Sequence, residues 1–190
     1  ANYGEGIHDL MTMSSEPGKQ LFWIGTSFIW ILLIIILDGK FYTTFSYPIY
    51  ILMICLLIGV LLVGKEIGGA KSWFDLGSFS MQPSEFAKIG ALLALSKFLS
   101  QLNVNLKEMT TQIKAFLIIA LPIGLILLQP DAGSAIVFTS LLLVLFREGI
   151  SSTYLIVSGS AIVLFIIALK FETQTTMLIV MVMSIILGYL

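Results

Sequence analysis

The sequence contains little charge: Asp, Glu, Lys and Arg make up 11% of its 190 residues, against about a quarter in an ordinary soluble domain. Hydrophobic residues make up 58%, and mean hydropathy is +1.03. A chain of this composition cannot cover its own apolar surface in water. Its apolar residues also fall in long blocks rather than in short alternating runs. The composition therefore indicates a protein whose solvent is lipid.

Other features are also scarce, and each absence excludes a class of protein. Net charge is −1 with no basic stripe, so nucleic-acid binding has no electrostatic basis. The single cysteine, Cys55, excludes a disulfide within the chain and argues against a thiolate metal site. Residues 1–6 lack the basic end and apolar core of a signal peptide. Because the chain also stops inside an apolar block, we expect an internal piece of a longer polypeptide.

The order of apolar blocks predicts an all-α fold, a polytopic transmembrane helical bundle that forms one integral-membrane domain over residues 1–190. Six complete spans and a truncated seventh are expected at about residues 21–37, 47–63, 82–99, 115–128, 132–146, 153–169 and 176–190. Residues 1–20 are expected to form an aqueous loop. Glycines and aromatic residues predict an ordered extracytoplasmic, interfacial loop at 64–81.

Two of these apolar blocks, 115–128 and 132–146, flank Gln129-Pro130-Asp131. At 1.5 Å per residue each arm covers only about 20–23 Å, less than the roughly 30 Å of a hydrocarbon core. This predicts a short-armed helical hairpin with its apex below the membrane surface, unless the arms take up residues at their outer ends.

The first polar motif opens the predicted span at 82–99. Pro83 suits the first turn of a helix, and Gln82, Glu85 and Lys88 share one face because they are spaced by three. Charges near the membrane boundary are costly unless they are paired, hydrated or functional. The motif is therefore either an intrahelical Glu85–Lys88 pair that anchors the helix end, or one wall of a polar cavity for an anionic, hydroxyl-rich ligand.

The second and third motifs leave similar alternatives open. Asp131, followed by Gly133 and Ser134, is an N-cap for the next helix, a functional carboxylate in a water-filled cavity, or both. In the loop, Lys71 could meet a phosphate as a point charge. Trp73 could stack on a sugar or lie among lipid headgroups.

Taken together, three segments resemble the SEDS family (shape, elongation, division and sporulation), and most closely its RodA branch. The segments are Gly-Ala-Lys-Ser-Trp-Phe-Asp-Leu-Gly (69–77), Gln-Pro-Ser-Glu-Phe-Ala-Lys (82–88) and Gln-Pro-Asp-Ala-Gly-Ser-Ala (129–135). The resemblance is strong from about Gly68 to Ile150. In this family a second basic residue usually stands where this chain has Ser72.

The resemblance implies a glycosyltransferase of the bacterial inner membrane that polymerises lipid II, works with a class B penicillin-binding protein, and serves elongation and cell shape. It implies that Glu85, Lys88, Gln129 and Asp131 face a polar cavity and that Lys71 occupies the family's first basic position. With Gln82, Ser84 and Trp73, these are the residues expected to line the substrate cavity. The family's catalytic aspartate lies in a later extracytoplasmic loop. We therefore expect no catalytic residue in this stretch, which by itself should be inactive.

Two rival functions stay open on the sequence alone. A flippase or transporter for the same lipid-linked precursor would also use intramembrane charges, without breaking a bond. A non-catalytic scaffold that recruits the penicillin-binding protein would need no intramembrane charges and would break no bond. The sequence identifies no cofactor; a divalent cation would suit a pyrophosphate leaving group, but no cluster of metal-ligand type is visible.

Overall fold

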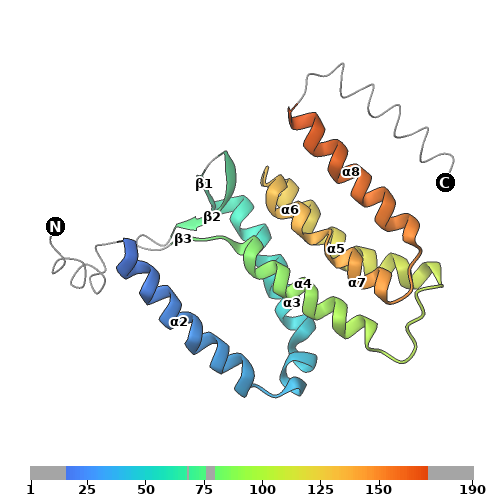
Figure 1. Ribbon diagram of the computed structural model, residues 1–190. Coiled ribbons are helices and arrows are strands. Elements are labelled where there is room, and N and C mark those ends of the chain that lie inside the picture. The colour runs from blue at the N-terminus through green and yellow to red at the C-terminus, as the bar shows by residue number, and fades with distance from the viewer. Residues whose placement is uncertain (1–15, 68, 76–79, 171–190) are drawn as a thin grey trace, which may run out of the picture. The chain divides into compact units, whose positions relative to one another are not determined.

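The computed structural model describes residues 16–67, 69–75 and 80–170, most of which are helical (Figure 1). In chain order the elements are α2 (Glu16–Ile36), α3 (Gly39–Val63), β1 (Lys65–Ile67), β2 (Ala70–Asp75), β3 (Ser80–Met81), α4 (Pro83–Leu99), α5 (Met109–Leu127), α6 (Ala132–Phe138), α7 (Leu141–Arg147) and α8 (Ser152–Lys170). The chain divides into two compact units, residues 1–44 and 45–190. The predicted span at 176–190 and most of the predicted loop at 1–20 lie outside the described residues.

Three helices among the described residues are long and apolar enough to cross a membrane. They are Gly18–Ile36, Gly39–Val63 and Met109–Leu127. Two shorter apolar helical stretches are Ala132–Arg147 and Ser152–Leu164. Helix α4 occupies the predicted span at 82–99 but has 17 residues, about 26 Å, and carries three charged side chains.

Helix α3 begins well before the predicted residue 47. The carboxylate of Asp38 accepts a hydrogen bond from the Lys40 N–H at 3.2 Å, and the carbonyl of Asp38 accepts from the Phe41 N–H at 2.9 Å. This cap starts the helix at Gly39. The prediction placed the start too late because it followed apolar content, and the first turns of α3 contain Lys40 and several polar side chains.

Residues 64–81, predicted as an interfacial loop, contain a small antiparallel sheet with strand order β1-β2-β3. Lys65 pairs with Trp73, and Phe74 pairs with Met81. Gly69 has φ +85°, a left-handed conformation that glycine adopts without steric cost and that allows the tight turn between β1 and β2. The sheet joins the end of α3 to the start of α4 (Figure 1).

The first arm of the predicted hairpin is longer than the apolar block at 115–128. Helix α5 begins at Met109, because the Glu108 carbonyl accepts from the N–H groups of Thr111 and Gln112 at 3.1 and 3.0 Å. Its 19 residues cover about 28 Å. The arm therefore takes up residues at its outer end, and the short-arm prediction is wrong for α5.

The second arm is divided where one continuous span was predicted at 132–146. Between α6 and α7, the side chains of Thr139 and Ser140 donate to the carbonyls of Ile136 and Val137 at 2.6 and 2.7 Å. Backbone N–H groups here bond three residues back rather than four. Such local bonds compete with the α-helical ladder and produce a tighter turn.

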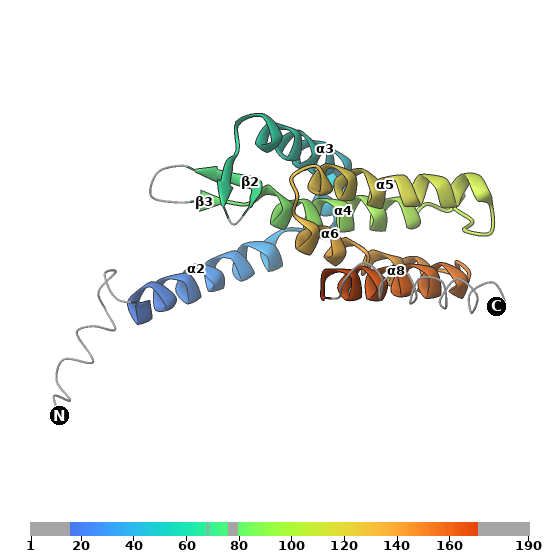
Figure 2. The ribbon, with the colours of Figure 1, turned by 90° about the horizontal axis from the view of Figure 1, so that it is seen from above.

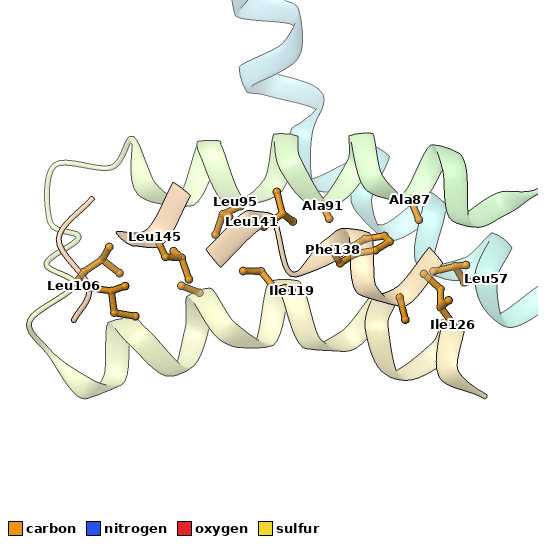
Figure 3. Packing of buried hydrophobic residues seen from close by; sticks show 13 residues of the cluster. Leu57, Ala87, Ala91, Leu95, Leu106, Ile119, Ile126, Phe138, Leu141 and Leu145 are labelled. Carbon is orange, nitrogen blue, oxygen red and sulfur yellow. The ribbon is translucent and has the colours of Figure 1, made fainter. Parts of the chain in front are cut away.

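The core lies within the unit 45–190, where α4 runs beside α5 and α6 contacts both (Figure 2). Figure 3 shows buried side chains from α3 to α7 that converge between α4 and α5: Leu57, Ala87, Ala91, Leu95, Leu106, Ile119, Ile126, Phe138, Leu141 and Leu145. Alanines on α4 allow neighbouring helices to approach, as is common between helices in lipid.

Gly90 in α4 lies close against α3. A Cβ atom at residue 90 would lie 3.0 Å from Cγ of Met53 and 3.4 Å from Cα of Tyr50. We therefore expect Gly90→Leu to destabilise the full-length protein by about 1–3 kcal/mol, measured by denaturant unfolding in detergent.

Gly124→Leu is the matched control, because nothing lies within 4 Å of a Cβ atom at that position in α5. It should unfold like the wild type. Equal loss of stability in both variants would contradict the close packing of α3 on α4.

Candidate functional site

The starts of α4 and α6 meet through four polar side chains, Gln82, Ser84, Asp131 and Ser134, which we call the polar junction. The Nε2 group of Gln82 donates to Oδ2 of Asp131 at 2.7 Å. Nε2 also lies 3.4 Å from Oγ of Ser134, which is 3.4 Å from Oγ of the fully buried Ser84. The bond between the Gln82 amide and the Asp131 carboxylate is the shortest of these contacts.

Asp131 is the N-cap of α6. Its Oδ1 accepts from the backbone N–H of Ser134 at 3.0 Å, while Oδ2 accepts from the side-chain amide of Gln82. The N-cap role, one of the alternatives that the sequence left open for Asp131, is therefore confirmed. Each carboxylate oxygen has two lone pairs, so the partly exposed Asp131 retains capacity to accept from a ligand hydroxyl.

One turn further along α4, Lys88 donates to both carboxylate oxygens of Glu85, at 2.8 and 2.7 Å. The side chain of Glu85 is 55% exposed and that of Lys88 is 26% exposed. Lys88 also lines a cavity of about 200 Å³ between α4 and the α6–α7 break, together with Ile89, Leu92, Val137, Phe138, Ser140 and Leu141. This cavity has mostly apolar walls and one cation at its edge.

The structure therefore brings together some of the predicted site residues and separates others. Gln82 bonds to Asp131, and Ser84 contacts Ser134 beside it, whereas both hydrogen bonds of Lys88 go to Glu85. Neither Asp131 nor Glu85 lines the cavity beside Lys88. A single hollow shared by all of these residues stays a prediction.

Gln129 is buried in the core, with no exposed surface. Its Nε2 donates to the carbonyl of Leu57 in α3 at 3.2 Å, and its Oε1 is buried without a hydrogen-bond partner. Gln129 thus tethers the α5–α6 turn to α3, and contact between Gln129 and a substrate stays a prediction.

Because Oε1 of Gln129 has no partner, substitutions at this residue should change the unfolding free energy by very different amounts. Gln129→Leu removes one hydrogen bond but also removes a buried unsatisfied oxygen, so we expect a change in unfolding free energy within about 1 kcal/mol. Gln129→Glu would bury a carboxylate against the carbonyl of Leu57 and should cost about 3 kcal/mol or more. Unfolding of both variants in detergent measures the difference, and a Glu variant as stable as the Leu variant would contradict the burial.

Lys71 and Trp73 both lie in strand β2 of the sheet. Nζ of Lys71 donates to the carbonyl of Leu62 at 3.1 Å, in the last turn of α3, where helical carbonyls lack partners. Trp73 is half-buried, and Oγ of the neighbouring Ser72 is buried without a partner. Contact of Lys71 with a phosphate, or of Trp73 with a sugar, stays a prediction.

Ser134 was not among the predicted site residues, although it connects three members of the junction. The available signal was its position three residues after Asp131, where a cap carboxylate accepts a backbone N–H. Within the described ranges, no group of three or more His, Cys, Asp or Glu side chains could hold a metal ion.

The Glu85–Lys88 pair should contribute little to stability, because more than half of the Glu85 side chain is exposed. A double-mutant cycle with Glu85→Gln and Lys88→Met, measured by unfolding in detergent, should give a coupling free energy below about 1 kcal/mol. Coupling above 2 kcal/mol would mean that the pair is a buried structural element.

In a comparison with known proteins, residues 8–187 match the model of the FtsW, RodA and SpoVE family, which is described as a cell cycle protein. The peptidoglycan glycosyltransferase RodA of Treponema pallidum is 36% identical over 75% of this chain and 33% of that protein. The crystal structure of RodA of Thermus thermophilus matches with TM-score 0.71 and 33% identity, over 84% of this chain and 54% of that one.

A third match, at TM-score 0.67 and 29% identity, is a chain from a structure described as a peptidoglycan synthase complex that coordinates polymerization and crosslinking. It covers 94% of this chain and 55% of that chain. The chain spans about a third of the length of the curated relatives it matches.

The apolar helices and the solved relatives define the class: this is a polytopic α-helical membrane protein, which confirms the predicted fold class. Its particular family follows from the match over 8–187. The chain belongs to the FtsW, RodA and SpoVE family, as the resemblance of its three motifs predicted.

Proposed function

We propose that this chain is part of a peptidoglycan glycosyltransferase of the bacterial inner membrane, which polymerises lipid II during cell elongation and shape maintenance. Family membership over residues 8–187 is the observation that carries the proposal. The relative from Treponema pallidum bears the name of this activity. A class B penicillin-binding protein is the proposed partner, supported by the match to a chain of a peptidoglycan synthase complex.

The reaction joins two lipid-linked disaccharides. A hydroxyl oxygen of the acceptor attacks the anomeric carbon of the donor, the bond from that carbon to the pyrophosphate breaks, and a base takes the hydroxyl proton. The resemblance implies that the family's catalytic aspartate lies in a later extracytoplasmic loop. The residues of this chain therefore bind and orient the substrate.

The polar groups at the starts of α4 and α6 suit this binding role. The carboxylate of Asp131 can accept from a sugar hydroxyl with lone pairs that its two bonds leave unused. Lys88 is a cation at the edge of an apolar cavity, which suits a ligand that combines anionic phosphate with a hydrocarbon chain. Substrate binding would then draw Lys88 partly away from Glu85.

One experiment separates the proposed enzyme from its rivals. Purified full-length protein, reconstituted with lipid II and without nucleotide, should produce glycan polymer. Vectorial movement of lipid II without polymer would instead support a transporter. Assembly with a penicillin-binding protein, without polymer or movement, would support a scaffold.

Within the enzyme, Glu85→Ala should lower the rate of lipid II polymerisation about tenfold or more, because it leaves Lys88 without its orienting partner. Glu108→Ala is the matched control, since Glu108 is exposed and its side chain makes no capping bond at the start of α5. Rates equal to the wild type in both variants would remove Glu85 from the proposed substrate wall.

A further inference from the structure

Asp131 is held at each carboxylate oxygen by a donor from a different part of the chain. The backbone N–H of Ser134, in the first turn of α6, donates to Oδ1 at 3.0 Å. The side-chain amide of Gln82, immediately before α4, donates to Oδ2 at 2.7 Å. With both oxygens bound, rotation about the bond to the carboxylate group is blocked, and the directions of the remaining lone pairs are fixed.

The donor on Oδ2 is an amide, and a neutral donor leaves the charge of the carboxylate in place. A lysine at residue 82 would neutralise the carboxylate, whereas the amide of Gln82 orients it and leaves its negative charge available to donors of a ligand. Pro83 fixes the backbone just after Gln82, and buried Ser84 adds a contact to Ser134 at 3.4 Å. The direction of the Gln82 side chain is thereby tied to the start of α4.

We infer that Gln82 is a positioning residue for glycosyl transfer, which acts on the substrate through Asp131 rather than by touching it. This rests on the proposed polymerase function, in which the Asp131 carboxylate accepts from a sugar hydroxyl. The bond from Gln82 to Asp131 also sets the position of α6 against α4. The geometry offered to the sugar therefore depends on one amide that is not itself in contact with it.

The first test compares Gln82→Ala with Gln101→Ala in the full-length protein. Loss of the amide donor should lower the rate of lipid II polymerisation about tenfold, the loss expected for one charge-assisted hydrogen bond. Gln101 donates to the hydroxyl of Tyr47 at 3.3 Å, beyond the end of α4, and its variant should retain wild-type activity. A Gln82→Ala protein as active as the Gln101→Ala control would overturn the inference.

The second test exchanges donor and acceptor, which separates positioning from mere tethering of two helices. Gln82→Glu places two carboxylates face to face and should lower the thermal midpoint. Adding Asp131→Asn restores the bond, because the new amide at 131 can donate to the carboxylate at 82 while its oxygen still accepts from Ser134. The midpoint should return to the wild-type value, while polymerisation should stay as low as in Asp131→Asn alone.

Other outcomes of the exchange decide against the inference. Recovery of activity together with the midpoint would mean that Gln82 only tethers the helices. Failure of the midpoint to recover would mean that the bond does not form in the working protein. A wild-type protein that makes no glycan from lipid II would overturn the proposed function itself, whereas a polymerising wild type with a fully active Gln82→Ala variant overturns the positioning role alone.

Discussion

A polar group surrounded by hydrocarbon must find its hydrogen-bond partner inside the protein, and this constraint determines where the helices of the unit 45–190 are joined. The hydroxyl of Tyr50 in α3 donates to the carbonyl of Ile118 in α5 at 3.0 Å. The amide of Gln112 in α5 accepts from the hydroxyl of Tyr154 in α8 and donates to the carbonyl of Leu106. A few side chains thus connect helices that are distant in sequence.

Apolar contacts alone would not fix these positions. In lipid, the association of apolar helices gains little from the hydrophobic effect, and the close fit of small residues takes over. The buried face of α4, with Ala87, Ala91 and Gly90, allows α3 and α5 to approach. Close packing sets how near the helices lie, while the polar bonds set which residues face each other. The polar junction depends on both, because the 2.7 Å bond needs α4 and α6 in close register.

The sequence predicted the helical membrane fold and the family, because long apolar blocks and three motifs are properties of the chain itself. Helix starts were less predictable. Apolar content placed the start of α5 at residue 115, but Gln112 lies in the first turn, with its polar groups satisfied by Leu106 and Tyr154. The contact between Gln82 and Asp131 joins positions 49 apart. No local pattern encodes that pairing, so the sequence could name both residues without placing them together.

The two Gln-Pro motifs illustrate how small offsets give similar sequences different roles. Before α4, Pro83 is the first helical residue and Gln82 is the cap position, but no side-chain bond caps the helix. Because proline has no N–H, the first turn has one unsatisfied donor fewer, and the Gln82 side chain is available to reach another helix. Before α6, the helix starts two residues later relative to the motif, so Asp131 occupies the cap and Gln129 turns into the core. One motif therefore supplies the carboxylate, the other supplies the amide that orients it, and the bond between them needs both helices to be in place.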